Sequence, residues 1–272
     1  MKYAVVSDIH ANIEAFTAVL NEIDRQDVAK IVCLGDSVGY YTNPNECLEI
    51  IQSRKIASVA GNHDRAGTGL KEPIEGCVEE GKRAITWTIP RLSPKNQKFL
   101  DDLPLVREVD GQFLIVHASL YPTPNEEIYI RHNNKETIQN NFDALVAHPS
   151  KAKICFFGHT HYPVCHRLLG KEMLEIKPSG VPVELNDADY FLINPGSVGQ
   201  SRDADPRASF LTYDTGSNMI HFYRVDYNRN ACLGKARQAG LLIEDSRFHK
   251  SVVWILDKLG IKEFIKKMVL RR

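Results

Sequence analysis

Short apolar runs that end abruptly in histidine, aspartate or asparagine constrain this chain most strongly. The clearest is Lys153–His161, in which Ile154–Phe157 is apolar without a break, Gly158 ends the run, and His159 and His161 follow. Unbroken apolar runs of this length are typical of buried strands. Residues two apart on an extended chain point the same way, so we expect both imidazoles to face one pocket. In an open α/β sheet, ligands bind at the carboxyl ends of strands.

The same pattern recurs earlier in the chain, where apolar runs alternate with amphipathic ones. Apolar residues at helical spacing predict a helix over Ala11–Ile23, and Asn43-Pro44-Asn45 begins a second helix that reaches Ile50 or Ile51. These helices separate three expected buried strands, Lys2–Val6, Ile31–Leu34 and Ile56–Ala60. This alternation is typical of a parallel sheet covered by helices.

The rest of the chain is less regular and mixes helices with short strands. Asp110-Gly111 between two apolar runs is a strong signal for a two-residue hairpin turn, and residues 119–134 are expected to be a loop. We expect one catalytic domain over residues 1–227 and a helical extension over residues 228–272 packed on it. The further expected helices are Cys77–Thr88, Pro94–Asp102, Glu136–Val146, Arg229–Gln238, Ser246–Leu259 and Ile261–Leu270, and the further strands are Val106–Val109, Phe113–Val116, Val164–Leu168, Met173–Ile176, Val181–Leu185, Tyr190–Ile193, Ala208–Tyr213 and Met219–Val225.

Charge and cysteine content limit the expected location and partners. Lys and Arg together number 34 and so do Asp and Glu, so no global field attracts nucleic acid or a membrane surface. Met1 leads into a strand-like run without a signal-peptide pattern, and no apolar run approaches the length of a membrane span. The six cysteines are scattered and form no CxxC pair, which argues against a structural zinc ribbon. We expect a cytoplasmic protein with reduced cysteines and a small-molecule substrate.

Eight residues at the ends of the expected strands carry oxygen or imidazole donors, and none carries a thiolate. They are Asp8, His10, Asp36, Asn62, His63, His117, His159 and His161. Five of them have an ordinary explanation when taken alone: Asp8 and Asp36 as helix caps, His117 as a buried core histidine, and Asn62 and His63 as part of a turn. Five strand ends that deliver such donors to one edge of a sheet predict a metal site instead. The donor set suits two divalent ions, with Mn expected and Fe, Zn or Ni as alternatives.

The motifs that contain these residues resemble those of the calcineurin-like metallophosphoesterases. They are Asp8-Ile9-His10, Gly35-Asp36, Gly61-Asn62-His63-Asp64, His117 and Gly158-His159-Thr160-His161, in the family's order. The resemblance implies an α+β fold of four layers, α/β/β/α, in which helices flank a β-sandwich core. It assigns Asp8, His10 and His161 to one ion, Asn62, His117 and His159 to the other, and Asp36 to both. It also implies in-line attack by a metal-bridging hydroxide, with His63 as the general acid and Asp64 orienting it.

Departures from the family's protein phosphatases narrow the expected substrate. Those enzymes have glycine after the first histidine and an Asp-Arg pair after the bridging aspartate, whereas this chain has Ala11 and the run Ser37-Val38-Gly39-Tyr40-Tyr41. The chain looks more like the small prokaryotic branch that cleaves phosphodiesters, nucleotides or dinucleoside polyphosphates. We therefore expect a metal-dependent phosphoesterase for phosphodiester or nucleotide-type bonds. A small-molecule or protein phosphomonoesterase and a non-catalytic metal-binding scaffold are the alternatives, and the oligomeric state stays open.

A glycine-rich segment after the strand Tyr190–Ile193 also resembles that branch. It contains Asn194, Gly196 and Ser197, and its glycines would let backbone N–H groups approach an anion. Arg202 and Arg207, which follow it, are suited to gripping a substrate phosphate in bidentate fashion. The alternatives are a structural strand-to-loop turn and ion pairs with Asp203 or Asp205.

Overall fold

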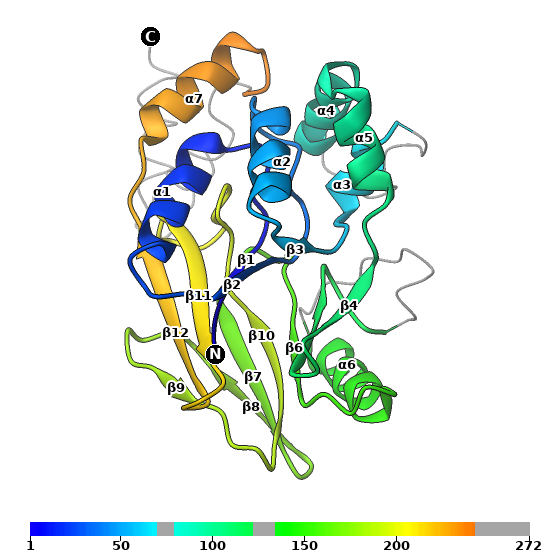
Figure 1. Cartoon of the computed structure of the whole chain (residues 1–272), viewed down its shortest axis with the longest axis vertical. Helices are drawn as coiled ribbons and strands as arrows, with labels where there is room; N and C mark the ends of the chain where they lie inside the picture. The colour runs from blue at the N-terminus through cyan, green and yellow to red at the C-terminus, as the bar shows by residue number, and fades with distance from the viewer. Residues whose placement is uncertain (70–78, 122–133, 243–272) are drawn as a thin grey trace, which may run out of the picture.

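Two six-stranded sheets form the centre of the molecule (Figure 1). The computed structural model describes residues 1–69, 79–121 and 134–242. In spatial order, the first sheet contains β3 (Ala57–Ser58), β2 (Lys30–Cys33), β1 (Lys2–Val6), β11 (Ala208–Asp214), β12 (Met219–Val225) and β9 (Val183–Glu184). The second contains β4 (Val106–Val109), β5 (Phe113–Val116), β6 (Ile154–Phe156), β10 (Tyr190–Asn194), β7 (Val164–Leu169) and β8 (Glu172–Ile176).

Both sheets are mixed, with a parallel part and an antiparallel part. β1, β2 and β3 are parallel, as expected from the strand–helix alternation, and β11 then pairs with β1 in the antiparallel sense. In the second sheet β5, β6 and β10 are parallel, while β4 and β7 flank them as antiparallel neighbours. The parallel part of each sheet therefore gathers several strand ends, with the loops that follow them, at one edge.

The alternation of side chains along β1 explains why this strand is apolar throughout. Tyr3 and Val5 belong to the core between the sheets, whereas Ala4 and Val6 belong to the core beneath the helices. All four are at most 1% exposed. A strand covered on both faces reads as a continuous apolar run, which is the pattern that predicted it.

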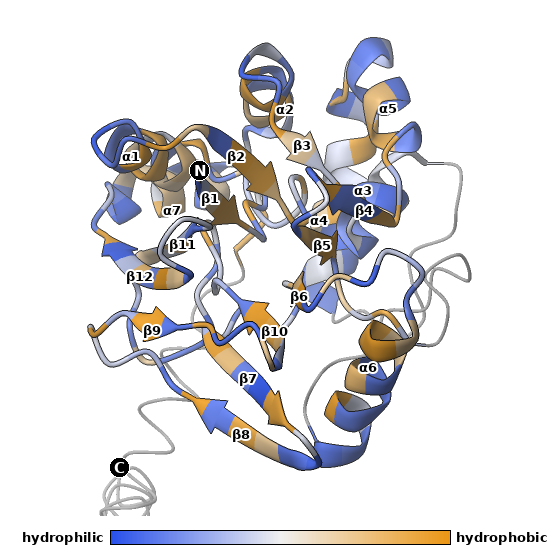
Figure 2. Cartoon of the chain, turned by 60° about the horizontal axis from the view of Figure 1, so that its bottom comes forward, coloured by the Kyte–Doolittle hydropathy of each residue, from blue (hydrophilic) through white to orange (hydrophobic). Residues whose placement is uncertain are grey.

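Helices cover the outer face of each sheet and complete four layers. α1 (Ile13–Ile23), α2 (Pro44–Ser53) and α5 (Pro94–Asp101) share a buried apolar cluster with the first sheet. α6 (Lys135–Ala147) packs Phe142 and Leu145 on the second sheet, and Figure 2 shows this helix with hydrophobic and hydrophilic parts. The described helices are completed by α3 (Asn62–Gly67), α4 (Glu79–Thr88), a 3₁₀ turn (Ile89–Arg91) and α7 (Arg229–Gln238). The expected α/β/β/α architecture is confirmed.

Local structure near the candidate site differs from the expectations in detail. The strand expected over Ile56–Ala60 is shorter, Ala57–Ser58; Val59 N still donates to Cys33 O at 3.2 Å, whereas the N–H of Ala60 donates to Pro104 O at 2.8 Å. The Gly-Asn-His-Asp motif, for which a turn was the ordinary alternative to a site, begins the short helix α3. The cap of α1 is Asn12, whose side chain accepts from Ala15 N, so Asp8 is not a helix cap.

Some expectations fall partly or wholly outside the described residues. These are the helices Ser246–Leu259 and Ile261–Leu270, most of the loop over residues 119–134, and the start of the helix expected from Cys77. Five cysteines are buried and unbonded to one another: Cys33, Cys47, Cys155, Cys165 and Cys232. Among the described segments, no helix combines the length and the apolar character that crossing a membrane requires.

Candidate metal centre

All eight expected donors meet at the carboxyl ends of parallel strands. Asp8 and His10 follow β1, Asp36 follows β2, Asn62 and His63 begin α3 after β3, His117 follows β5, and His159 and His161 follow β6. Except for the partly exposed His159, these residues are buried. Donors from both sheets therefore converge on one interior region.

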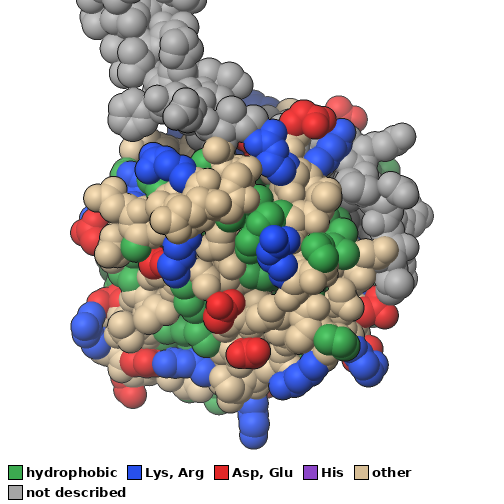
Figure 3. Space-filling model, turned by 90° about the horizontal axis from the view of Figure 1, so that it is seen from above, with side chains coloured by type: hydrophobic (Ala, Val, Ile, Leu, Met, Phe, Trp, Pro, Cys, Tyr) green, Lys and Arg blue, Asp and Glu red, His purple; other side chains and the backbone are tan. Residues whose placement is uncertain are grey.

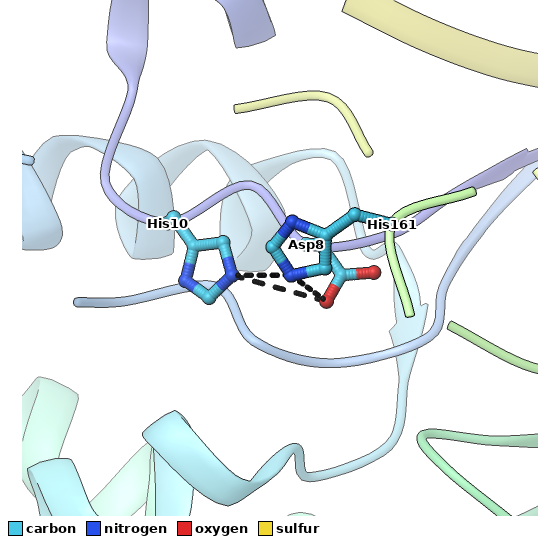
Figure 4. A group of neighbouring side chains, drawn as sticks. All are labelled: Asp8, His10 and His161. Carbon is cyan, nitrogen blue, oxygen red and sulfur yellow. Dashed lines mark hydrogen bonds and ion pairs between the residues drawn. The ribbon is translucent and has the colours of Figure 1, made fainter. Parts of the chain in front are cut away.

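The first group consists of Asp8, His10 and His161 (Figure 4). The Nε2 atoms of the two histidines lie 3.2 Å apart. Oδ1 of Asp8 lies 3.2 Å from Nε2 of His161 and 3.8 Å from Nε2 of His10. Ligand atoms that bind one ion at about 2.1 Å are separated by about 3.0–3.5 Å in octahedral or tetrahedral geometry. The group therefore has roughly the spacing of ligands around a single ion, and Oδ1 of Asp8 is buried without a hydrogen-bond partner among the residues that the structure describes.

Backbone carbonyls fix the tautomers of three histidines. In each, Nδ1 contacts a carbonyl oxygen, which only accepts, so Nδ1–H donates and Nε2 keeps its lone pair in the neutral ring. The Nε2 lone pairs of His10 and His161, 3.2 Å apart, repel each other unless a positive charge lies between them. In metal sites, the ring N–H of a ligating histidine commonly donates to a backbone carbonyl, as it does here. The three pairs are His10 with Val38 O (3.1 Å), His117 with Leu34 O (2.8 Å) and His161 with Gln200 O (2.5 Å).

The second group consists of Asp36, His117 and His159, with Asn62 beside them. Nε2 of His117 lies 3.3 Å from Oδ2 of Asp36 and 3.1 Å from Oδ1 of Asn62. Nδ1 of His159 lies 3.3 Å from the same Nε2 atom. Four side chains from three loops and α3 thus present donor atoms to one point.

Asp36 lies between the two groups. Its Oδ2 is 3.3 Å from Nε2 of His117 and 3.7 Å from Nε2 of His10. Its Oδ1 accepts from the backbone N–H of His63 at 2.8 Å, which fixes the orientation of the carboxylate. A single carboxylate is therefore within reach of both sets of donors.

The electrostatic balance of the pocket favours cations. Burial by itself raises the pKa of Asp8 and Asp36, but the imidazoles of His161 and His117 outweigh it and hold both pKa values below the ordinary value. Burial by itself lowers the pKa of His117, but the Asp36 carboxylate raises that pKa to about 9. Burial lowers the pKa of His10. Both carboxylates therefore stay ionised although they are buried, and a buried charge has to be compensated.

The loops that carry the candidate ligands adopt a backbone conformation that residues other than glycine rarely take. Asp8, His10, Asp36, His159 and His161 all have φ between +52° and +65°. Backbone in this region costs of order 1–3 kcal/mol per residue and clusters at functional sites. The extended backbone expected for His159–His161 is therefore wrong. The turns send His161 to the first group and His159 to the second, which is the division that the family resemblance implies.

His63 lies next to candidate ligands of both groups. A ring nitrogen of His63 lies within 4.8 Å of donor atoms of His10 and Asp36, and the His63 ring packs on Tyr40 with centroids 4.8 Å apart. Nδ1 of His63 is buried without a hydrogen-bond partner among the described residues. Burial lowers the pKa of His63, the Asp36 carboxylate opposes this shift, and the neighbouring His161, His117 and Arg202 add to the lowering.

Asp64 binds backbone N–H groups. It accepts from Ser37 at 2.8 Å, from Val38 at 3.3 Å and from Gly61 at 2.9 Å. Burial raises the pKa of Asp64 to about 6, and Asp36 adds to the effect. Its hydrogen bonds tie the loop after Asp36 to the start of α3, so any influence on His63 passes through the backbone.

The end of β10 and the segment that follows it bind the loop after β6 and the loop after β1. Nδ2 of Asn194 donates to Gly158 O at 2.7 Å and to the Thr160 hydroxyl at 3.0 Å. Oγ of Ser197 donates to Asp8 O at 2.9 Å. Gly196 N donates to Oδ1 of Asn194, and Gly196 has a φ of +82°. Asn194 and Ser197, expected as substrate-binding residues, are at most 1% exposed and bind the loops themselves.

The two expected arginines lie at the edge of the site. Nη1 of Arg202 donates to His159 O at 3.4 Å. Arg207 uses Nε and Nη2 to bind the Asp205 carboxylate, with a shortest distance of 2.7 Å. The ion pair that the sequence left open as an alternative is therefore present for Arg207.

Several residues that hold the site carry no local signal in the sequence. Gln200 accepts from Nδ1 of His161 through its carbonyl, and Asn12 donates to Gly199 O at 2.9 Å. Tyr40 packs on His10 with ring centroids 4.7 Å apart. Each contact joins segments far apart in the chain or depends on a turn, so no residue spacing reveals it.

Comparison with known proteins identifies relatives that match most of the chain. The family model described as the calcineurin-like phosphoesterase superfamily domain matches residues 1–218. An uncharacterized protein from Methanocaldococcus jannaschii is 37% identical over 227 residues, which cover 83% of this chain and 87% of that protein.

Solved structures agree with this match. A metallophosphoesterase from Sphaerobacter thermophilus is 33% identical, with a TM-score of 0.74 over 89% of this chain and 95% of its own. A hypothetical protein from Pyrococcus horikoshii shares the fold at 17% identity, with a TM-score of 0.71 and the same coverage. The chain belongs to the calcineurin-like phosphoesterase superfamily.

Proposed function

We propose that this chain hydrolyses phosphodiester or nucleotide-type phosphate bonds with two divalent metal ions. The observation that supports this most is the position of Asp36, whose Oδ2 lies 3.7 Å from His10 Nε2 and 3.3 Å from His117 Nε2. We assign Asp36 to both ions. We assign Asp8, His10 and His161 to one ion and Asn62, His117 and His159 to the other. Manganese is the expected metal, because the donors are oxygens and imidazoles without thiolates.

The ions, when bound, would stabilise charge on the phosphoryl oxygens and lower the pKa of the attacking water. The chain's own residues place the reacting groups. We assign His63 to protonate the leaving oxygen, because its ring nitrogen lies within 4.8 Å of Asp36 and it is the imidazole left over from the ligand assignment. Tyr40 and His10 hold the ring of His63, with centroids 4.8 Å from it in both cases. Asp64 is a positioning residue, since its bonds run to the backbone.

A diester is the preferred substrate in this proposal because of the charge beside the site. The residues after Asp36, Ser37-Val38-Gly39-Tyr40-Tyr41, carry no charge. This segment therefore offers no cation to pair with the second negative charge of a phosphate monoester. A phosphodiester carries only one negative charge and does not need such a cation. Figure 3 looks onto the helical end of the molecule, where basic and acidic side chains are interspersed rather than gathered by sign. The described residues visible on that face form no extended basic surface for a polyanion.

The test compares the hydrolysis of bis(p-nitrophenyl) phosphate and p-nitrophenyl phosphate in manganese, for the wild type and for Asp36→Asn. We expect faster cleavage of the diester and loss of both activities in the variant. Preferential cleavage of the monoester would assign the protein to the phosphomonoesterases. Absence of metal-dependent turnover of either ester would contradict the proposal. The non-catalytic metal-binding scaffold would then be the remaining interpretation.

A further inference from the structure

A large cavity lies against the loop that carries His159 and His161. It has a volume of about 1230 Å³ and is lined by residues from the start of α6, the start of β7, the end of β8 and the end of β12. Figure 2 shows β7, β8 and α6 at the same end of the molecule. Thr160 lines it from between the two histidines. Arg202 also lines it and donates to His159 O. The cavity therefore adjoins the loop that carries two of the candidate ligands, although none of the eight donors lines it.

The charged side chains around this cavity are predominantly basic. Two of the three carboxylates are already held by arginines, since Arg224 pairs with Asp203 and Arg207 pairs with Asp205. Burial lowers the pKa of the nearby His166, so that ring stays neutral at pH 7. Five cations stand against three carboxylates: Lys135, Lys177, Arg202, Arg207 and Arg224 against Glu175, Asp203 and Asp205.

Donors remain available after these pairs are made. Arg207 binds Asp205 through Nε and Nη2, which leaves Nη1 without a partner among the described residues, and its side chain is 43% exposed. Within the same described part of the chain, Lys135 makes no hydrogen bond or ion pair. Arg202 has the weak bond to His159 O at 3.4 Å. Guanidinium and ammonium groups of this kind bind phosphate oxygens.

The cavity also offers flat apolar surface. Tyr162 is 50% exposed at its edge, next to Pro163. Exposed aromatic rings stack on nucleobases with little dependence on base identity. Phosphate-binding donors and an exposed ring thus line the same cavity.

A second cavity of about 770 Å³ provides an internal comparison. It is lined by residues of β2, β4 and the ends of α1 and α2, and it contains four cations and four carboxylates. Lys30 binds Asp110 there at 2.8 Å and Arg54 binds Asp24 at 2.8 Å. Its described lining has no excess of positive charge and includes no residue of the metal-site loops, so the charge excess distinguishes the first cavity from this one.

We propose that the larger cavity binds the part of the substrate remote from the reacting phosphorus, and that this part carries at least one further phosphate and a flat ring, as in esters of nucleoside di- and triphosphates. The inference rests on the phosphoesterase function proposed above. In the reaction, the oxygen of water bonds to the attacked phosphorus, the P–O bond to the leaving group breaks, and the leaving oxygen takes the proton.

The test uses thymidine 5′-mono-, di- and triphosphate, each esterified with p-nitrophenol at the terminal phosphate, at one fixed concentration of free Mn²⁺. Chromatography of all products counts attack at any phosphorus. We expect kcat/KM for the di- or triphosphate ester to exceed that for the monophosphate ester by about tenfold, since a charge-assisted hydrogen bond contributes roughly that factor. We expect Arg207→Gln and Lys135→Gln each to lower this ratio about threefold or more. The matched control is Arg107→Gln. Arg107 lines the second cavity, so its substitution should leave the ratio unchanged.

Two results overturn the inference while the proposed function stands. One is turnover of all three esters with equal kcat/KM. The other is a preference for the longer esters that persists in the Arg207→Gln, Lys135→Gln double variant. If none of the three esters nor bis(p-nitrophenyl) phosphate is hydrolysed, the proposed function fails and the inference falls with it.

Discussion

The Nε2 atoms of His10 and His161 lie 3.2 Å apart although 151 residues separate them in the chain. Each ring donates its Nδ1–H to a backbone carbonyl, so both Nε2 lone pairs face the same point beside the Asp8 carboxylate. This contact is unfavourable unless a cation joins the two rings. The stability of the protein should therefore depend on metal.

Metal loading is expected to raise the melting temperature. At 100 times its dissociation constant, a ligand that binds only the folded state adds about 2.7 kcal/mol. For a chain of this size that corresponds to roughly 5–10 °C. Differential scanning calorimetry of protein treated with chelator, with and without Mn²⁺, measures the shift. We expect His161→Gln to reduce it sharply and His221→Gln, whose ring lies outside the ligand groups, to keep it. An equal shift in both variants would exclude His161 as a ligand.

His63 and Asp64, adjacent in sequence, are expected to behave differently when substituted. His63→Gln removes the proposed proton donor, so kcat for a diester should fall by about 10²–10⁴ with little change in melting temperature. Asp64→Asn loses at least one of three buried hydrogen bonds to backbone N–H groups and should lower stability by about 1–3 kcal/mol. Kinetics and urea unfolding of the two variants separate these effects. A stable Asp64→Asn variant with unchanged kcat would remove the positioning role.

Gly199 is expected to tolerate no side chain. A Cβ atom there would lie 1.9 Å from the carbonyl oxygen of Ile9, and that backbone belongs to the loop between Asp8 and His10. Gly199→Ala should therefore cost about 2–4 kcal/mol and weaken metal binding, because the ligand loop has to move. Gly234→Ala in α7 is the control, since a Cβ there meets no atom within 4 Å. It should be neutral or stabilising by about 0.5–1 kcal/mol. Similar unfolding curves for the two variants would contradict the packing described for Gly199.

Most strands and helices could be predicted because their signals are local. The hairpin around Asp110-Gly111, the helix Arg229–Gln238 and the strand Lys2–Val6 occur where turn residues and apolar spacing indicate them. The order of strands could not be predicted in this way, since β1 pairs with β11 from the far end of the chain. The four-layer architecture followed from the family resemblance rather than from periodicity.

The donor residues could be predicted from their positions at strand ends, but their geometry could not. Residue spacing does not reveal that His159 and His161 turn toward different groups, because this depends on left-handed backbone at both residues; only the family resemblance implied this division. Nor does it reveal that Asp64 binds Ser37 and Val38, or that Asn194 and Ser197 hold the ligand loops. These contacts are long-range, and their residue types are common in ordinary turns.

The most direct test of the account is the number of metal ions that one chain binds. Protein freed of metal and titrated with Mn²⁺ by isothermal calorimetry, with metal content confirmed by mass spectrometry, should bind two ions per chain. Asp36→Asn should weaken both binding steps, because Asp36 lies between the two groups of donors. Binding of one ion or none by the wild type, or two ions with unchanged affinity in Asp36→Asn, would contradict the shared two-metal centre.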